Sequence, residues 1–246
     1  MRLPTHGPHV FVDPAAITVD TAELDDDDGH HLTRALRRGE GDAVSVADGA
    51  GTVWQARIAR TGPPVLVTLE QRYDVPAPDP PLWVVHALPT GRKLDEVVRR
   101  LCELGVDRVE PAVSARCENR PPSAKAAKAR QRWRAVARAA AKQARRARPV
   151  EVAEVVAWPG SLAHHTAGAV LWEEAEHPLG ATLGATVPVG RGAPVVLGIG
   201  PEGGLTAEEV QAAATPAATL GPTILRTETA SVAAAAIALE RLGRLG

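Results

Sequence analysis

Two stretches near the C-terminus carry residue types and spacings that could do chemistry. The first is GIGPEGGLTAEEV, residues 198–210, in which Gly198, Gly200 and Gly203 have the G-x-G-x-x-G spacing of a dinucleotide-binding loop. Glu202 lies inside this spacing, where its carboxylate would repel a pyrophosphate. The loop therefore favours a neutral or cationic ligand, and an ordinary glycine-rich turn is the simpler alternative.

The helix after this loop is predicted to begin only near Ala207. Thr206 and Glu209 have the T-x-x-E spacing of a capping box, which marks a helix start. In a dinucleotide site the helix begins within the glycine motif, so that its N-terminus meets the phosphates. The later start leaves the loop clear of the helix end and again argues against a pyrophosphate.

The second stretch is LGPTILRTETASVAAAAIALERLG, which begins at Leu220 with a Gly-Pro turn. Its polar cluster consists of Arg226, Thr227, Glu228 and Thr229. An alanine-rich helix is predicted over 229–243, capped by Thr229 or Ser231. Taken alone, the stretch is slightly better explained as a capped helix with an incidental ion pair.

Charge is unevenly distributed along the chain, although the formal net charge is only −1. Residues 1–74 hold 7 basic and 12 acidic residues, residues 75–148 hold 17 and 7, and residues 149–246 hold 4 and 10. Within the basic block, residues 119–148 contain 11 Lys or Arg and no acidic residue. A solvated helix face is the plain interpretation, but the lack of acidic partners favours contact with a polyanion.

A proline-rich segment divides the elements that must position these residues. Residues 75–81 contain four prolines and are predicted to be an extended linker. Residues 1–74 indicate a small β-rich domain, with a hairpin around 48–51 and a short helix over 29–38. The acidic run 25–28 is interpreted as a solvated loop. Residues 82–246 indicate a second domain in which strands and helices alternate.

This alternation predicts a mostly parallel sheet with helices on both faces, in an open, doubly wound arrangement. Strands are predicted over 82–88, 106–113, 169–174 and 194–200, and near ATLG and TILR before the last helix. Helices are predicted over 94–104, 123–147 and 206–214, the first of them capped by Gly105. Trp133 is expected to anchor the second of these helices to the core.

Composition excludes several classes of protein. The two cysteines, Cys102 and Cys117, are too few for a secreted disulfide scaffold and suit buried thiols in a reducing cytoplasm. The N-terminal residues lack the apolar core of a signal peptide, and no apolar run is long enough to span a bilayer. The histidine pairs 30–31 and 164–165 suggest surface or loop residues, so no metal site is expected.

The two C-terminal stretches together resemble a known family. IGPEGGLTAEEV and LGPTILRTETA are similar to the paired motifs of the ribosomal RNA small subunit methyltransferase E family, of the SPOUT class. GRKLDEVVRRLCELGVDRVEPAVSARC and KQARRARPVEV resemble further family segments, and GHHLTRALRRGEGDAVSVADGAGTVWQARI resembles its N-terminal domain. The chain departs from the family pattern at Lys142, Ala144 and Arg145, where the family often has Glu, a small polar residue and Gly.

The resemblance implies a fold and an activity. The fold would be an N-terminal PUA-like β-barrel followed by an α/β domain with a deep trefoil knot, which no pattern in the residues predicts. The activity would be methylation of N3 of a uridine in 16S rRNA, with S-adenosylmethionine as methyl donor. The protein would be a cytoplasmic homodimer that binds the small ribosomal subunit and uses no metal.

The resemblance also implies site residues. The cofactor would lie among Leu171, Trp172, Glu173, Leu197, Gly198, Gly200, Pro201, Glu202, Gly203, Gly204, Leu220, Gly221, Ile224, Leu225 and Arg226. Arg226 would stabilise the uracil anion, and Glu202 or Glu228 would accept the N3 proton. The RNA would contact Arg34, Arg37, Arg38, Arg116, Arg120, Lys142, Arg145 and Arg146.

Two alternatives from other classes remain at this point. A nicotinamide-dependent oxidoreductase would use the glycine motif, with an acidic residue about 20 positions further on. Glu228 lies loosely at that distance but belongs to the second motif. A non-catalytic RNA-binding or ribosome-assembly protein would bind RNA with steep salt dependence and transfer no methyl group.

Overall fold

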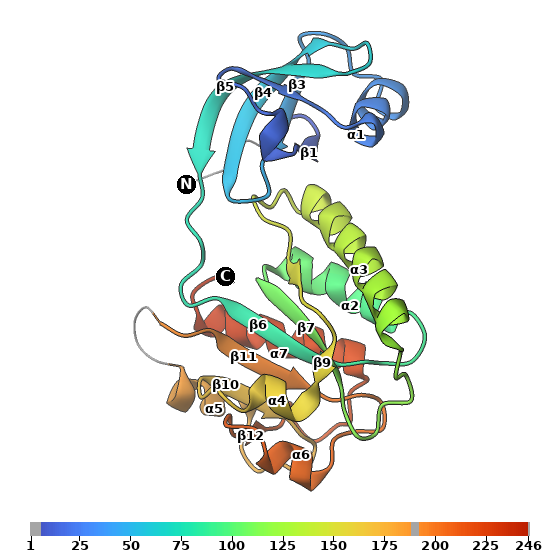
Figure 1. Cartoon of the computed structure of the whole chain (residues 1–246). Helices are drawn as coiled ribbons and strands as arrows, with labels where there is room; N and C mark the ends of the chain where they lie inside the picture. Colours follow the sequence, from blue (N-terminus) through green and yellow to red (C-terminus); the bar gives the residue numbers. More distant parts are fainter. Residues whose placement is uncertain (1–5, 188–191, 246) are drawn as a thin grey trace. The chain divides into compact units, whose positions relative to one another are not determined.

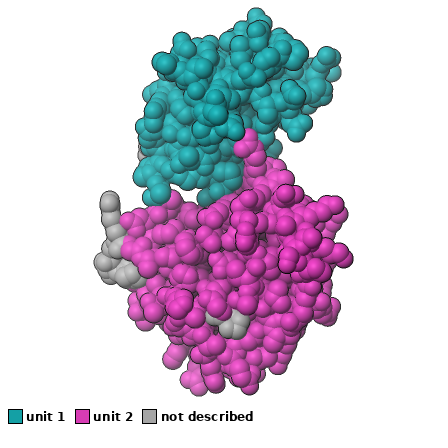
Figure 2. Space-filling view, in the orientation of Figure 1, with its two compact units in different colours: residues 1–77, 141–149 teal, residues 78–140, 150–246 magenta. Residues whose placement is uncertain are grey.

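The computed structural model describes residues 6–187 and 192–245, which fold into two compact units (Figure 2). Unit 1 comprises Met1–Ala77 and Ala141–Pro149, and unit 2 comprises Pro78–Ala140 and Val150–Gly246. The first crossing between the units falls within the proline-rich segment 75–81. Residues 141–149 belong to unit 1 although they are far from the rest of it in sequence.

Unit 1 is built on a curled five-stranded sheet that forms a half-barrel (Figure 1). Its strands are β1 (His9–Phe11), β2 (Thr21–Glu23), β3 (Ala43–Ala47), β4 (Thr52–Arg60) and β5 (Leu66–Asp74). The strand order is β1-β3-β4-β5-β2, so β1 and β2 form the two edges of the described sheet. Its concave face buries valine, leucine and isoleucine side chains, among them Val46, Ile58 and Val67.

The predicted hairpin is confirmed. β3 and β4 pair antiparallel with Ala47 opposite Val53. Between them the Asp48 carboxylate accepts hydrogen bonds from the backbone N–H groups of Ala50, Gly51 and Thr52. One aspartate therefore satisfies three turn donors and fixes the register of the whole hairpin.

The prediction for the acidic run 25–28 was wrong. Asp25 caps α1 (Asp26–His30) by accepting a hydrogen bond from Asp28 N–H, and Asp28 is only 4% exposed. Carboxylates suit this position because the helix N-terminus is the positive end of its dipole. The predicted helix over 29–38 instead begins at Asp26 and continues as the π-helical turn η2 (His31–Ala35); a 3₁₀ turn, η1 (Pro14–Ala16), precedes it.

Unit 2 contains the predicted parallel sheet. Its strands are β6 (Leu82–Ala87), β7 (Arg108–Val113), β8 (Glu151–Val152), β9 (Val156–Ala157), β10 (Gly168–Leu171), β11 (Val195–Ile199) and β12 (Ala217–Ala218). The order is β12-β10-β11-β6-β7-β8, with β9 also paired to β7, and all of these pairs are parallel. β11 is buried along its whole length, as expected for an inner strand covered on both faces.

Helices cover both faces of this sheet (Figure 1). They are α2 (Lys93–Leu104), α3 (Ser123–Gln143), α4 (Trp158–Leu162), α5 (Leu179–Thr186), α6 (Ala207–Gln211) and α7 (Thr227–Arg241). α7 packs against α2, α5, β6 and β11, whereas α4 packs against β6, β7 and β9. The last three residues of α3 belong to unit 1. Trp133 is buried and anchors α3 as predicted.

The sequence correctly predicted the buried face and C-terminal glycine of α2 and the capping box of α6. Leu94, Val97, Val98 and Leu101 are buried on one face of α2, and Gly105 ends the helix with a φ of 108°. At α6, the Thr206 hydroxyl accepts from Glu209 N–H while the Glu209 carboxylate accepts from Thr206 N–H. The predicted capping box is therefore confirmed, although α6 ends at Gln211 rather than residue 214.

The prediction was wrong around the start of α7. The helix begins at Thr227, so Thr229 and Ser231 lie inside it and cap nothing; Ser231 Oγ donates to the Thr227 carbonyl. No strand forms over 223–226, which follow Gly221, with a φ of 120°, and Pro222. Neither residue suits a strand, because one adopts a left-handed conformation and the other lacks an N–H. The trefoil knot stays a prediction.

Candidate active site

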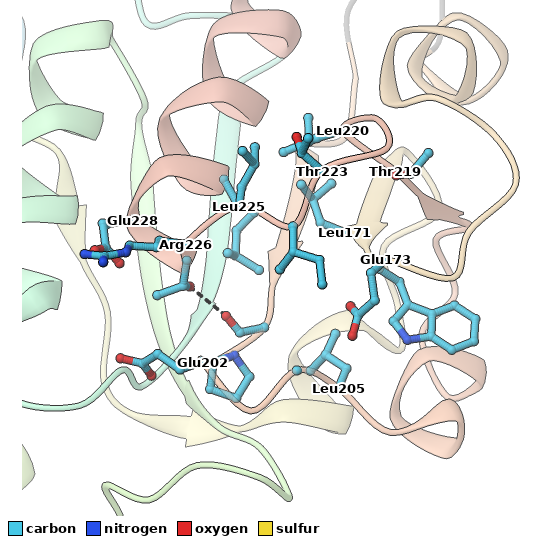
Figure 3. Close-up of a pocket in the computed structure, with 18 of the residues that line it drawn as sticks. Leu171, Glu173, Glu202, Leu205, Thr219, Leu220, Thr223, Leu225, Arg226 and Glu228 are labelled. Carbon is cyan, nitrogen blue, oxygen red and sulfur yellow. Dashed lines mark hydrogen bonds between the residues drawn. The ribbon is translucent and has the colours of Figure 1, made fainter.

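A pocket of about 600 Å³ opens at the carboxyl ends of β10, β11 and β12 (Figure 3). Three loops form it, at residues 171–173, 199–205 and 218–226, with Lys93 of α2 and the first turn of α7 completing the wall. Ligand sites of α/β sheets lie at this edge, because parallel strands all point their carboxyl ends there. The volume is in the range of small-molecule sites.

Most of the predicted cofactor residues line this pocket. They are Leu171, Trp172, Glu173, Gly200, Pro201, Glu202, Gly203, Gly204, Leu220, Gly221, Ile224, Leu225 and Arg226, together with Glu228 from the proposed catalytic set. Leu197 and Gly198 do not line it: both lie within β11 and are buried. A Cβ on Gly198 would approach Leu162, Trp158 and Val170 to 3.1–3.2 Å, so this glycine serves packing beneath the site.

Sequence reasoning missed several lining residues. They are Lys93, Ile199, Leu205, Ala218, Thr219, Pro222, Thr223, Thr227 and Ala230. Most are immediate neighbours of predicted residues, so a wider window around each motif would have found them. Lys93 is different, because it reaches the site from α2, which precedes the glycine loop by more than a hundred residues.

Glu202 is held by Thr90, which precedes α2, and by Lys93, the first residue of α2. Its carboxylate accepts hydrogen bonds from Thr90 N–H at 3.1 Å, Thr90 Oγ1 at 2.8 Å and Lys93 Nζ at 2.6 Å. Partial burial alone would raise the pKa of Glu202, but the bonds from Lys93 and Thr90 lower it to about 2. The carboxylate is therefore an ionised clamp that joins the glycine loop to α2.

Arg116 supports the same loop from another side. Its guanidinium donates to the Gly203 carbonyl at 3.1 Å. Gly204 has a φ of 72°, a left-handed conformation that favours glycine, and a Cβ there would lie 3.1 Å from Glu173 Oε1. Its backbone conformation therefore favours glycine at this position.

The segment 114–120 that carries Arg116 is itself held in place. Arg120 donates to the carbonyls of Ser114, Ala115 and Cys117. Ala115 N–H donates to Glu209 Oε1 at 2.6 Å, which links this segment to the capping box of α6. Arg120, predicted to bind RNA, therefore has its hydrogen bonds directed at backbone in this structure.

The glycine loop and the start of α7 meet at one hydroxyl. Thr227 Oγ1 donates to the Gly200 carbonyl at 2.7 Å (dashed line in Figure 3). On the other side, Thr227 Oγ1 lies 3.4 Å from Nε2 of His86, a fully buried residue of β6. Burial lowers the pKa of His86 to about 4, so its ring is neutral at neutral pH.

Arg226 and Glu228 flank Thr227 on the wall of the pocket (Figure 3). Arg226 is exposed. Oε2 of Glu228 is buried and has no hydrogen-bond partner among the described residues. A buried carboxylate oxygen without a donor is costly, and such a group at a pocket wall is suited to receive a proton or a ligand N–H.

The predicted RNA-binding residues that belong to unit 1 fall into two groups. Arg34, Arg37 and Arg38 are exposed, around and after η2. In contrast, Lys142 forms an ion pair with buried Asp28, and Arg145 donates to the Gly7 carbonyl. Arg146 contributes its carbonyl, which accepts from His9 Nε2 at 3.0 Å. Two of the departures from the family pattern are thus used within unit 1.

The pocket fits S-adenosylmethionine by its chemistry. Three carboxylates line it, Glu173, Glu202 and Glu228, which suits a sulfonium cation. Leu171, Leu205, Leu220 and Leu225 supply apolar walls of the kind that a purine ring requires. Among the described residues no cluster of three potential metal ligands occurs. No described helix is long and apolar enough to cross a membrane.

Comparison with known families defines the class. A model described as "RNA methyltransferase domain" matches residues 76–239, and one described as "RNA methyltransferase PUA domain" matches residues 24–69. The first covers more than half of the chain. The fold and the site are therefore those of an RNA methyltransferase with an N-terminal PUA domain.

Comparison with individual proteins identifies a family within this class. The chain is 33% identical to the ribosomal RNA small subunit methyltransferase E of Mycobacterium bovis, over 96% of this chain and 90% of that protein. The structure of the same-named enzyme from Neisseria gonorrhoeae, bound to S-adenosylmethionine, matches with a TM-score of 0.81 and 26% identity, covering 96% of this chain and 98% of that one. A Legionella pneumophila methyltransferase in complex with the same molecule has the same fold, with a TM-score of 0.81, 23% identity and 98% of each chain covered. The chain belongs to the ribosomal RNA small subunit methyltransferase E family.

Proposed function

We propose that this protein transfers a methyl group from S-adenosylmethionine to N3 of a uridine in 16S rRNA. The observation that carries the proposal is the pocket itself, in which both C-terminal motifs of the family meet around three carboxylates and a set of apolar walls. The relatives named for small-subunit rRNA methylation, and the related structure that holds S-adenosylmethionine, support it.

When bound, S-adenosylmethionine would supply an electrophilic methyl group on a sulfonium centre. We infer that the glycine loop, residues 200–204, would hold it together with Leu171, Leu220 and Leu225. Backbone groups of the loop can approach a ligand closely because glycines occupy positions 200, 203 and 204. Glu173 and Glu202 would add negative potential that favours the cation.

Uridine N3 carries a proton, which a base must remove before the nitrogen can attack. We propose Glu228 as this base. Glu202 is the poorer candidate, because its pKa of about 2 reflects a carboxylate already bonded to three donors. Glu228 has a buried oxygen with no described partner and lies on the pocket wall. Arg226, two residues before it in the chain, would stabilise the negative charge that develops on the uracil oxygens.

The base must be unpaired or flipped out of a helix to reach this pocket. We propose that the exposed Arg34, Arg37 and Arg38 contact rRNA phosphates, with Arg116, Arg120, Lys142, Arg145 and Arg146 as the remaining candidates from the sequence. The internal contacts of Lys142, Arg145 and Arg120 make these three the weaker members of the set. We further propose a cytoplasmic homodimer with a knotted active site and no metal.

The two alternative functions are less well supported. An oxidoreductase would place a pyrophosphate where Glu202 stands, whereas the clamp from Lys93 and Thr90 keeps that carboxylate ionised. A non-catalytic RNA-binding protein has no need for a pocket whose wall presents Arg226 and Glu228.

The test is methyl transfer from labelled S-adenosylmethionine to small ribosomal subunits from cells that lack this enzyme. A methyl group on N3 blocks Watson–Crick pairing, so reverse transcription should stop at one new position, at a uridine. Arg226→Ala is the control and should remove both the label and the stop. Bound S-adenosylmethionine without any label in rRNA would contradict the proposal.

A further inference from the structure

His86 is a histidine that neither motif includes and that does not line the pocket. It lies on β6, paired with Ile199 of β11 in the sheet, one residue before the glycine loop begins. Its side chain is fully buried, with 0% exposure. A fully buried ionisable ring requires satisfied hydrogen bonds, and those bonds reveal what the ring does.

The protonation of the ring follows from its partners. Nδ1 lies 2.6 Å from the Ala87 carbonyl, which can only accept, so Nδ1 must carry the proton. Because the ring is neutral at neutral pH, Nε2 then has a lone pair and can only accept. The single group near Nε2 among the described contacts is the Thr227 hydroxyl at 3.4 Å.

That hydroxyl has one proton and two acceptors. The proton is shared in a three-centre hydrogen bond, with the main branch to the Gly200 carbonyl at 2.7 Å and a weaker branch to Nε2 at 3.4 Å. Gly200 belongs to the glycine loop and Thr227 to the first turn of α7, and both line the pocket. The ring thus lies behind the only described hydrogen bond that joins these two walls directly.

We propose that His86 is a positioning residue for the S-adenosylmethionine site. Its neutral Nε2 confines the Thr227 hydroxyl, which in turn fixes the Gly200 carbonyl against the start of α7. The inference rests on the proposed function in that the ligand is S-adenosylmethionine. It adds a residue from the centre of the sheet that touches neither ligand nor substrate.

The first experiment measures the Kd for S-adenosylmethionine by calorimetry, without RNA. Thr227→Val removes both branches and should raise the Kd about fivefold, the scale of one neutral hydrogen bond. His86→Phe removes only the weaker branch and should raise the Kd about threefold, and the double variant should bind no more weakly than Thr227→Val alone. His86→Gln, whose amide oxygen can replace the Nε2 acceptor, should change the Kd less than about twofold. Independent, multiplying effects of the two substitutions would overturn the proposal, as would wild-type affinity in His86→Phe.

Loss of packing is separated from loss of positioning by two controls. Thermal melting shows whether His86→Phe is folded; if it is not, Thr227→Val and His86→Gln, which disturb the core less, carry the test. A role in packing alone would make Gln as harmful as Phe, because neither reproduces the ring and its hydrogen bonds together. That outcome would also overturn the proposal.

A second experiment needs no ligand. In ¹⁵N NMR spectra of histidine-labelled protein, His86 should be the Nδ1–H tautomer, and Thr227→Val should shift its Nε2 resonance. An Nε2–H tautomer, or a resonance unmoved by Thr227→Val, would refute the contact. If the wild-type protein binds no S-adenosylmethionine, the proposed function fails, while the NMR result still decides the role of the ring.

Discussion

Two buried histidines, one in each unit, have similar hydrogen-bond partners but different roles. In unit 1, His9 Nε2 contacts the Arg146 carbonyl at 3.0 Å and Nδ1 contacts Ser45 Oγ at 2.9 Å. In unit 2, His86 also has one nitrogen on a carbonyl and the other facing a hydroxyl. The pKa of each ring is about 4, with burial as the main cause.

The two histidines differ in where their hydroxyl partners, Ser45 and Thr227, lie. Ser45 lies in the middle of β3, so His9 ties the segment 141–149 to the sheet of its own unit. Thr227 lines the pocket and bonds to a loop that also lines it. The same chemistry therefore completes a fold in unit 1 and shapes a site in unit 2.

Carboxylates repeat this contrast. Asp28 of unit 1 is buried and pairs through Oδ1 with Lys142, while its Oδ2 is buried without a hydrogen-bond partner among the described residues. Glu228 of unit 2 has a buried oxygen with no partner among the described residues. The two carboxylates differ in where they lie: Asp28 pairs with Lys142 inside unit 1, whereas Glu228 lines the pocket of unit 2.

The largest expected effect is the loss of turnover on substitution of Glu228, the carboxylate of unit 2 that lines the pocket. Glu228→Gln keeps the shape of the side chain and removes the base, so turnover should fall about 1,000-fold, within the usual range for general bases. The Kd for S-adenosylmethionine should change little. Single-turnover methylation of small subunits measures the rate, and Glu202→Gln is the matched comparison.

Glu202→Gln should behave differently, because Glu202 is a clamp rather than a base. Its main effect should be a weaker Kd for S-adenosylmethionine as the glycine loop loosens from Lys93 and Thr90. If Glu202→Gln instead abolished turnover at saturating S-adenosylmethionine while Glu228→Gln remained active, the assignment of the base would be reversed.

Acid should destabilise the protein through both histidines. Each ring has a folded pKa of about 4 against about 6.5 in the unfolded chain, so the unfolded state binds more protons between these values. Stability should therefore fall as the pH drops from about 6.5 to about 4, by about 3 kcal/mol for each ring at the most. Urea unfolding at pH 7, 5 and 4 measures this loss.

His9→Gln separates the contributions of the two rings to the loss of stability in acid, because it removes one of the two titrations. The loss of stability between pH 7 and pH 4 should become smaller than in the wild type, while the Kd for S-adenosylmethionine at pH 7 stays unchanged. An unchanged acid response in this variant would mean that His9 does not contribute to it.

A smaller loss is expected when the ion pair in unit 1 is broken. Lys142→Met leaves Asp28 buried without its partner and should cost about 2 kcal/mol, less than for a fully buried pair because the lysine side chain is 25% exposed. Lys128→Met, at an exposed position of α3, is the control and should leave stability unchanged. Equal stability of the two variants would return Lys142 to the group of free RNA-binding candidates.

Local features could be predicted from the sequence because their partners are near in the chain. The hairpin at Asp48, the glycine at the end of α2 and the capping box of α6 each depend on residues at most four positions apart. The motif pair also predicted most of the pocket wall, since each loop contributes consecutive residues.

What the sequence did not reveal depends on distant partners. Lys93 and Glu202 are 109 positions apart, Lys142 and Asp28 are 114 apart, and His86 and Thr227 are 141 apart. Only the folded chain brings such pairs together, so the sequence predicted a solvated loop for the acidic run and did not predict the internal partner of Lys142. The surroundings of Gly198 also depend on distant partners: its spacing fits a ligand loop, and in the structure its neighbours are Leu162, Trp158 and Val170.

The smallest effect concerns the arginines of unit 1 that the structure leaves exposed. Arg34→Gln removes one phosphate contact, so it should weaken rRNA binding about threefold and reduce the slope of log affinity against log salt by about one. Stability and the Kd for S-adenosylmethionine should not change, because Arg34 is exposed and does not line the pocket. Arg145→Gln is the informative partner, since its guanidinium already bonds to the Gly7 carbonyl and its loss should lower stability more than RNA affinity. If both variants lost the same salt dependence and neither lost stability, the basic residues of unit 1 would form one RNA surface, and the division between exposed and internally used side chains would have no functional meaning.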